Sequence, residues 1–336
     1  MEKNIIILQN KRILYIGPKF FGYELEIQRT LKDLGAQVTF YDDRPANDFL
    51  TKVLIRLKLK LFIEVKIDKY YNKIYNDIKN IKYDYIFVVA PETLDYKKLQ
   101  QIQLLQKNAK SILYMWDSFE NKNSFNTIDL FDKVITFDSN DADKYNLKFL
   151  PLFFIKNYEN IKDLNNYEYE LCFTATAHSD RYEIAKKIEK QLHKFNFKMY
   201  SFFYLPSKVM YWVRKLFISK YKYGDINDFS FSSFSQQEII ENIEKSKVIL
   251  DINHPSQYGL TSRTIEALGA NRKLITTNKN IINYDFYNEN NILIIDRNNP
   301  LINKDFLESN YIKPLDNIYK KYSLEEWLKN IFKIVK

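Results

Sequence analysis

The feature that most constrains the fold is an alternation of short apolar runs with longer amphipathic segments along nearly the whole chain. The apolar runs have the length of strands, and the segments between them have the apolar spacing of helices. Strands that are apolar at almost every position must be covered on both faces, which is the arrangement of a parallel sheet between helices. In the first half, we predict strands at residues 12–16, 37–41, 83–90, 111–116 and 133–137, and helices at 25–34, about 47–81 and 99–106.

The alternation stops once and then begins again. Pro151 and the polar run 156–167 form the interruption, which indicates a connection between two domains. A chain of 336 residues is long enough for two such domains. We therefore predict an α/β protein with domains at 1–155 and 166–320. In the second half, we predict strands at 170–174, 197–203, 248–252, 273–277 and 291–295, and helices at 182–195, 236–245, 261–268, 303–309 and 323–335.

Composition narrows the range of partners. The single cysteine suits a reducing cytoplasm, and no apolar run reaches transmembrane length. With one cysteine and three histidines, no spacing resembles a zinc site, so we predict no metal. The net charge of +9 favours an anionic partner such as a nucleotide or a phospholipid surface. We predict no nucleic-acid partner, because the charge is diffuse and no recognition motif is present.

The segment 259–277 reads as a glycine turn, a helix, a glycine stop and a buried strand. Arg263 and Glu266 are three residues apart in the predicted helix, so they share a face. A helix start and an arginine suit phosphate, and a carboxylate suits the hydroxyls of a ribose. Gly259, Arg263 and Glu266 are therefore predicted to bind a charged, hydroxyl-rich ligand.

Other candidate residues follow predicted strands, where open parallel sheets bind their ligands. The loop with Gly17, Lys19 and Gly22 either covers an acceptor or phosphate or is a simple turn between strand and helix; it lacks the third glycine of a dinucleotide fingerprint. His178, Asp180 and Arg181 either contact phosphate or form a helix cap with a charged first turn. His254 is either a ligand contact or an ordinary loop histidine. The remaining polar residues at these strand ends are Glu24, Asp43, Arg44, Glu92, Asp117 and Asp138.

Two segments are basic, apolar and amphipathic. Residues 201–223 mix aromatic and aliphatic side chains with lysine and arginine, the composition of a helix that lies in a membrane interface. Residues 50–60 have a similar character. The alternative for both is an ordinary core helix whose lysines extend to water.

Taken together, the chain resembles GT-B glycosyltransferases, and more closely the bacterial lipopolysaccharide and capsule biosynthesis proteins of the CgeB-like group. The resemblance covers nearly the whole chain and is most specific in 259–278. It includes the two α/β halves, the proline between them and a final helix at 321–336 that is expected to pack back toward the first domain. The phrases that carry it are Tyr41-Asp-Asp-Arg-Pro45, Leu113-Tyr-Met-Trp-Asp-Ser118, Phe149-Leu-Pro-Leu152, Thr176-Ala-His-Ser-Asp-Arg181 and Leu274-Ile-Thr-Thr-Asn278.

The resemblance implies two Rossmann-like domains that face each other across a cleft, an acceptor domain at 1–155 and a donor domain at 166–320. A nucleotide-sugar would be the co-substrate, with no cofactor and no metal. Glu266 would bind the ribose, while Arg263 and the 175–181 loop would hold the diphosphate. Many retaining members carry an acidic residue eight positions before the equivalent of Glu266. Tyr258 stands there in this chain, so the resemblance does not establish a retaining mechanism.

An inverting transfer needs a general base near the acceptor hydroxyl. Asp117 is the first candidate and Glu24 the second, because both are expected on first-domain loops. The sequence thus predicts a glycosyltransferase that extends a lipid-linked surface glycan, located in the cytoplasm and peripherally on the anionic inner membrane. Two alternatives remain open: a sugar-nucleotide epimerase of the same fold, and a non-catalytic carbohydrate-binding or assembly subunit.

Overall fold

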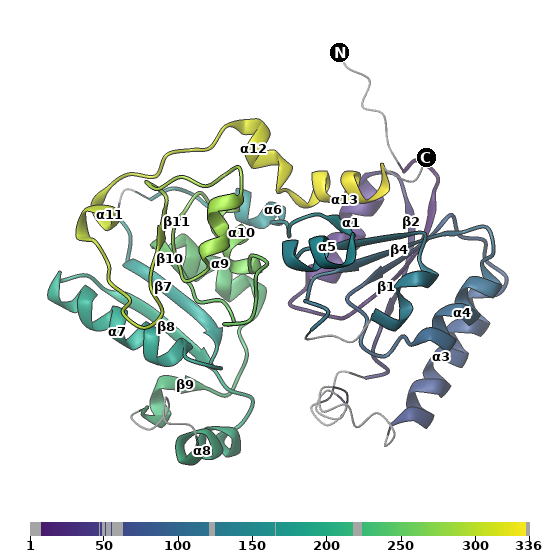
Figure 1. Cartoon of the computed structure of the whole chain (residues 1–336), viewed down its shortest axis with the longest axis horizontal. Helices are drawn as coiled ribbons and strands as arrows, with labels where there is room; N and C mark the ends of the chain where they lie inside the picture. The colour runs from purple at the N-terminus through teal and green to yellow at the C-terminus, as the bar shows by residue number, and fades with distance from the viewer. Residues whose placement is uncertain are drawn as a thin grey trace. The chain divides into compact units, whose positions relative to one another are not determined.

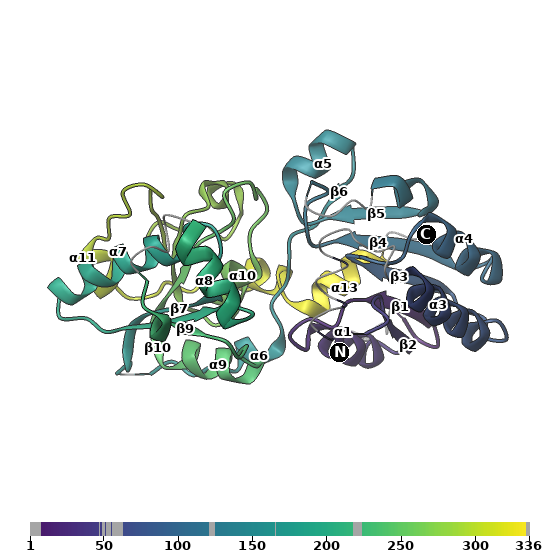
Figure 2. The same ribbon diagram turned by 90° about the horizontal axis from the view of Figure 1, so that it is seen from below.

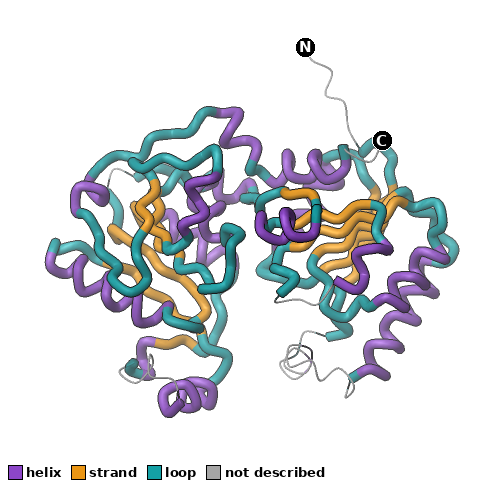
Figure 3. Tube along the Cα trace, in the orientation of Figure 1, coloured by secondary structure: helices purple, strands orange, loops and turns teal. Residues whose placement is uncertain are grey.

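The computed structural model describes residues 8–46, 48, 51, 55, 63–120, 125–164, 166–217 and 224–333. The chain divides into two compact units, the first made of Met1–Pro151 with Leu324–Lys336 and the second of Leu152–Ser323 (Figure 1). These units are the first and second domains below. Each contains its own parallel sheet with helices packed on it, and strand alternates with helix along the chain (Figure 3). The predicted α/β class with two Rossmann-like domains is confirmed.

The sheet of the first domain joins six of the described strands, all parallel, in the order β2-β1-β3-β4-β5-β6. The strands are β1 (Arg12–Gly17), β2 (Gln37–Asp42), β3 (Tyr85–Val89), β4 (Lys110–Met115), β5 (Lys133–Thr136) and β6 (Lys148–Phe149). The described helices are α1 (Tyr23–Asp33), α3 (Glu64–Ile78), α4 (Tyr96–Leu105), α5 (Ser139–Tyr145) and α13 (Leu324–Phe332), with the 3₁₀ turn η2 (Phe125–Leu130).

Both faces of this sheet are buried, because side chains alternate between faces along each strand. One face of β1, β3 and β4 packs on α3 and α4 in a single apolar cluster that includes Leu14, Val88 and Leu113. The opposite face carries Tyr15, Phe87 and Tyr114, which are fully buried. The continuous apolar strands of the sequence are thus explained by helices on two sides.

The last helix, α13, completes that opposite face. The Trp327 ring lies edge-on to Tyr114, with centroids 4.6 Å apart, and the Phe332 ring lies 5.5 Å from Phe87. α13 also contacts α1, and the two lie side by side in Figure 2. The C-terminal helix is therefore part of the first domain's core, although the rest of that domain ends at Pro151.

The sheet of the second domain joins six described strands, again all parallel, in the order β12-β11-β10-β7-β8-β9. The strands are β7 (Tyr169–Thr176), β8 (Met199–Tyr204), β9 (Phe229–Ser230), β10 (Ser246–Asp251), β11 (Lys273–Thr276) and β12 (Ile292–Ile294). The described helices are α6 (Lys156–Glu159), α7 (Arg181–Lys194), α8 (Lys208–Phe217), α9 (Gln236–Glu244), α10 (Ser262–Gly269), α11 (Lys304–Glu308) and α12 (Asp316–Lys321), with 3₁₀ turns η4 (Ile226–Asp228) and η5 (Lys279–Asn283).

In the second domain, too, the side chains of each strand point alternately to the two faces of the sheet. Phe173 and Leu250 point to the face that holds α7, where they join Ile188 in one apolar cluster. α9 and α10 contact the central strands β7, β10 and β11. Both faces of the central strands are therefore buried, as in the first domain.

The structure differs from the sequence expectations mainly in short elements. The strands β6 and β9 and the helices α5, α6 and α12 were not predicted, because each is too short to show a period. The expected helix over about 47–81 contains α3, and most of 47–62, including much of the amphipathic run 50–60, lies outside the described residues. Of the amphipathic segment 201–223, the described part ends at Phe217 with α8.

Gly269 was expected to end its helix as a glycine stop, and this interpretation was wrong. Gly269 is the last residue of α10, and Asn271 supplies the left-handed turn with φ 51°. A Cβ on Gly269 would lie 2.6 Å from Cγ and 2.7 Å from Cβ of Phe154, which is fully buried. The residue is glycine because α10 packs against the Phe154 side chain.

We expect Gly269→Ala to lower the free energy of unfolding by about 1–3 kcal/mol, because the new methyl group overpacks this contact. Urea denaturation of the purified chain measures the change. The same substitution in a Phe154→Ala background should cost less, because alanine removes the Cγ atom and the ring that the new methyl group would meet. Equal costs in the two backgrounds would show that Phe154 is not the reason for the glycine.

Candidate functional site

Four strands of the second domain end side by side at one edge of the sheet. Asp251 at the end of β10 pairs in register with Thr276 of β11, which in turn pairs with Ile294 of β12. β7 ends nearby at Thr176 and pairs with β10. The loops after these strands therefore meet at the carboxyl edge, the position where open parallel sheets bind ligands.

Asp251 joins the end of β10 to the start of α10. Its Oδ2 accepts hydrogen bonds from the hydroxyls of Thr261, at 2.8 Å, and Thr264, at 2.7 Å. Thr261 also caps the helix by accepting a bond from the Thr264 amide. The carboxylate is only 4% exposed, so it serves the fold. It closes the loop 252–260, which holds His254 and Gly259, between a strand end and a helix start.

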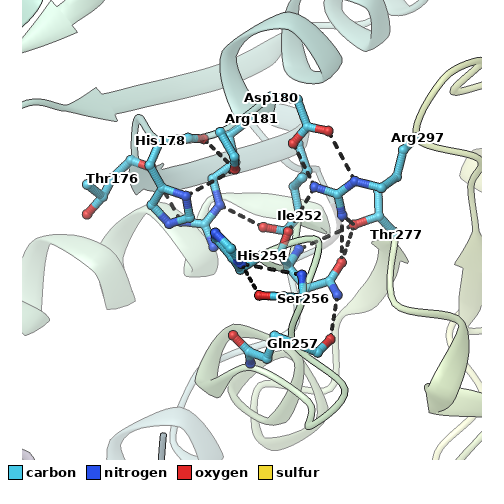
Figure 4. A network of polar contacts seen from close by, with 12 residues as sticks. Thr176, His178, Asp180, Arg181, Ile252, His254, Ser256, Gln257, Thr277 and Arg297 are labelled. Carbon is cyan, nitrogen blue, oxygen red and sulfur yellow. Dashed lines mark hydrogen bonds and ion pairs between the residues drawn. The ribbon is translucent and has the colours of Figure 1, made fainter. Parts of the chain in front are cut away.

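Arg297, which follows β12, connects three neighbouring loops (Figure 4). It makes a two-point ion pair with Asp180, with N–O distances of 3.1 and 2.6 Å. Its Nη1 donates to Asn253 Oδ1 at 2.9 Å and to Thr277 Oγ1 at 3.0 Å, and its Nη2 donates to the Asn253 carbonyl. Asn253 continues the network by donating to the Gln257 carbonyl at 3.0 Å. The loops at this edge are thus fixed to one guanidinium.

The predicted residues His178, Arg181 and His254 come together beside this network (Figure 4). Arg181 Nε donates to the Ile252 carbonyl at 2.7 Å and Nη1 donates to the Thr176 carbonyl at 3.3 Å. The rings of His178 and His254 lie 5.6 Å apart, and His254 Nδ1 is 2.8 Å from Ser256 Oγ. The edge is therefore rich in side chains that can carry positive charge.

Burial lowers the pKa of His178 to about 3, and the charges of Arg181, His254 and Arg214 act in the same direction. The imidazole is therefore neutral at neutral pH. Burial disfavours any charge on the imidazole, whereas the smaller contributions of Arg181, His254 and Arg214 come from neighbouring cations, which would attract an anion. Arg214 belongs to α8, so that helix adds a cation to this edge.

Arg263 and Glu266 form an ion pair on α10, with Nη1 2.6 Å from Oε2. They share a helix face, as their spacing predicts. Glu266 is only 4% exposed, and Arg263 is partly buried. The carbonyl of Gly259, just before the helix, accepts from Gln257 Nε2 at 3.0 Å and Asn278 Nδ2 at 3.2 Å. The turn at Gly259 precedes the N-cap residue Thr261, and the ion pair of Arg263 with Glu266 follows it in α10.

In the first domain, the predicted loop 17–22 is held by two charged groups. Arg44 Nη2 donates to the Lys19 carbonyl at 2.9 Å, and Glu24 Oε2 accepts from the Phe20 amide at 3.0 Å. Glu24 is buried, which leaves its carboxylate turned toward its own loop. Gly22 caps α1 with φ 81°, a left-handed conformation that favours glycine. A Cβ on Gly17, at the end of β1, would lie 3.1 Å from the Tyr15 ring.

Asp117 follows β4 at the same edge of the first sheet. Its Oδ1 accepts from the Ser118 amide at 3.1 Å, and the residue is half-buried. The neighbouring Trp116 ring lies 5.7 Å from Phe20 and 6.4 Å from Tyr23. These ring contacts bring Asp117 and the 17–22 loop to one place in the first domain.

Sequence reasoning did not single out Asp251, Asn253 or Arg297. Each follows a predicted strand or ends it, which is the one signal that could have found them. Among the described residues, no group of three or more His, Cys, Asp or Glu side chains could hold a metal ion. None of the described helices combines the length and the apolar character that a membrane crossing requires.

Several solved structures are similar to this chain over nearly its whole length. An α-glucosyltransferase described in complex with UDP and a 13-mer DNA is 12% identical, covers 95% of each chain and has a TM-score of 0.59. Anabaena Alr3699/HepE, in complex with UDP and glucose, is 10% identical over 97% of this chain and 100% of its own, with a TM-score of 0.59. A glycosyltransferase from Rickettsia africae ESF-5 is 16% identical over 97% of each chain, with a TM-score of 0.54. No protein-family profile and no curated protein sequence matches the chain.

At these low identities the likeness defines the fold. The chain has the GT-B fold: two Rossmann-like domains, each with a parallel sheet, in the architecture of these enzymes. The predicted GT-B fold is confirmed. Membership of the CgeB-like group remains a prediction from the sequence.

The depressed pKa of His178 predicts a pH dependence of stability. In the unfolded chain the imidazole takes up a proton below about pH 6.5, whereas in the folded chain it stays neutral down to about pH 3. Stability is therefore retained above about pH 6.5 and is lost as the pH falls from there toward 3. We expect the urea midpoint of the wild type to fall more steeply with acidification than that of His178→Gln.

The control is His193→Gln, on the exposed part of α7. This variant should follow the wild type between about pH 7 and pH 4.5, because it leaves His178 in place. If His178→Gln shows the same slope as the wild type, His178 is not held neutral by the fold.

Proposed function

We propose that the protein is a glycosyltransferase that moves a sugar from a nucleotide-sugar to a glycan acceptor. The observation that carries the proposal is the carboxyl edge of the second domain, where Arg181 lies beside the two histidines in a GT-B fold. Two of the similar solved structures are described as glycosyltransferases. UDP is present in one of these and in the HepE structure. A site of this charge suits the diphosphate of a nucleotide-sugar.

In the proposed complex, α10 and the loop 175–181 bind the donor. Arg263 and Arg181 hold the diphosphate, with His178, His254 and the Gly259 turn around it. Glu266 accepts hydrogen bonds from the ribose. The donor would separate Glu266 from Arg263, whose Nη1 lies 2.6 Å from Oε2 in the present ion pair. The cations then stabilise the negative charge that develops on the leaving diphosphate, without a metal.

The acceptor is proposed to bind the first domain at the loop with Gly17, Lys19 and Gly22. Glycosyl transfer passes through an oxocarbenium-like state, and an inverting transfer needs a base for the acceptor hydroxyl. Asp117 is the first candidate because it is half-buried and follows a strand end. Glu24 is the second, since its carboxylate already accepts from the Phe20 amide. Tyr258 stands where many retaining enzymes have an acid, so this position does not support a retaining mechanism of that type.

We further propose that the acceptor is a lipid-linked surface glycan of the lipopolysaccharide or capsule type, at the cytoplasmic face of the inner membrane. The net charge of +9 supports an anionic surface as partner. DNA is present in the structure of the similar α-glucosyltransferase, so DNA is included among the test acceptors. Transfer to DNA alone would contradict the glycan acceptor.

The donor site is tested by thermal shift against a panel of nucleotides and nucleotide-sugars, because a bound ligand raises the melting temperature by mass action. We expect Arg263→Ala and Glu266→Ala to weaken the affinity for the best ligand by about tenfold or more, since a hydrogen bond to a charged group contributes about 1.5–3 kcal/mol. The matched control is Arg29→Ala, which removes another i,i+3 ion pair, with Glu26 on α1, and should leave affinity unchanged. Unchanged affinity in both α10 variants would refute the site.

The reaction is tested with labelled nucleotide-sugars and extracted glycolipid acceptors. We expect Asp117→Asn to lower turnover by about 10²- to 10⁴-fold with unchanged nucleotide affinity, because it removes the base and leaves donor binding intact. Glu24→Gln is assayed beside it, and near-normal turnover in both variants would rule out both candidates. Conversion of the nucleotide-sugar without any acceptor would favour an epimerase. Nucleotide binding with no turnover would favour a non-catalytic subunit.

A further inference from the structure

The helix α8 has its apolar stripe turned outward. Val209, Trp212, Val213, Leu216 and Phe217 follow the i, i+3, i+4, i+7, i+8 spacing of one helix face. In a helix that covers a core this face would be buried. Here these five side chains are between 45% and 82% exposed, and we call them the α8 stripe.

The orientation of the helix is fixed from its other side. Tyr211 is buried in the core of the second domain, where its ring lies 5.4 Å from Phe229 of β9. Its hydroxyl donates to the Gly224 carbonyl at 2.9 Å, and Lys215 Nζ donates to the same carbonyl at 3.1 Å. The outward direction of the stripe is therefore set by specific contacts, and Figure 1 shows α8 beside β9 at one end of the domain.

Cations lie along both edges of the stripe. Lys208 and Lys215 are seven residues apart and follow one edge, and Arg214 follows the other. Lys215 Nζ also lies 5.8 Å from the centre of the Trp212 ring. The helix contains no acidic residue. An exposed apolar stripe with a tryptophan and basic edges has the pattern of a helix that lies flat in a lipid interface.

We propose that α8 docks the second domain on an anionic phospholipid bilayer, with the α8 stripe among the acyl chains and Lys208 at the headgroups. This inference rests on the membrane location in the proposed function. It assigns the contact with the membrane to one helix, α8. The charge around the α8 stripe favours an anionic bilayer over a second copy of the chain as its partner. A second copy of the chain would bring the same basic edges together, whereas an anionic bilayer neutralises them.

The test is co-sedimentation of the full chain with vesicles of phosphatidylglycerol and phosphatidylcholine. We expect binding that falls as salt is added and is weak on phosphatidylcholine alone. The double variant Leu216→Ser with Phe217→Ser should lower the partition coefficient by about tenfold or more, because two apolar side chains no longer enter the bilayer. The matched control, Leu301→Ser with Leu315→Ser, changes two equally exposed side chains of the same domain and should bind as the wild type does.

Tryptophan emission gives a second, residue-specific readout. The chain has three tryptophans, Trp116, Trp212 and Trp327, and Trp327 is buried in the first domain. Vesicles should shift the emission to shorter wavelength in the wild type and in Trp116→Phe. Trp212→Phe should lose the shift. A shift that persists in Trp212→Phe, or equal vesicle binding by the stripe variant and its control, would overturn the proposal.

Two further outcomes separate the hypotheses. Wild-type self-association that disappears in the stripe variant, together with no vesicle binding, would assign the surface to a second copy and overturn the lipid proposal. Vesicle binding through α8 without any sugar transfer would remove the proposed function and leave this inference intact. Sugar transfer to a soluble glycan by a protein that does not bind vesicles would overturn this inference and support sugar transfer as the function.

Discussion

The guanidinium of Arg297 is the group on which the carboxyl edge of the second domain depends. It joins Asp180, Asn253 and Thr277, which follow three different strands, and is itself carried by the loop after a fourth. A flat group with five N–H donors can satisfy several loops at once, which a lysine could not do. Asp180 also offsets the charge of Arg297. One ion pair therefore fixes the positions of these loops and contributes to the charge at the edge.

In the first domain, a buried carboxylate holds the loops at the ends of the strands. Asp43 accepts hydrogen bonds from the amides of Thr93 and Leu94 and from the Tyr71 hydroxyl. Burial raises the pKa of Asp43, and the amide hydrogen bonds oppose that rise. Beside it, Arg44 reaches the loop 17–22 through the Lys19 carbonyl. In both domains one polar side chain orders the loops at the strand ends, while the sheet itself is ordered by apolar burial.

Sequence reasoning recovered the fold because apolar periodicity is a local signal. Every predicted strand corresponds to an observed one, and the helix with Arg263 and Glu266 appears where their spacing placed it. Short polar elements such as α5 have no period and were missed. Arg297 and Asn253 were missed for another reason. Arg297 contacts Asn253 from 44 positions away and Asp180 from 117 positions away. Such contacts depend on the strand order, which the pattern of apolar residues does not specify.

α8 relates the surface of the second domain to its candidate site. The helix follows β8, whose carboxyl end lies next to that of β7 in register, so α8 starts at the same edge as His178. Its outer face carries the apolar stripe, while the charge of Arg214 contributes to the lowered pKa of His178. A surface that takes up the stripe would hold the helix, and with it the position of that cation. The exposed apolar face and a cation that acts on His178 therefore belong to one short helix.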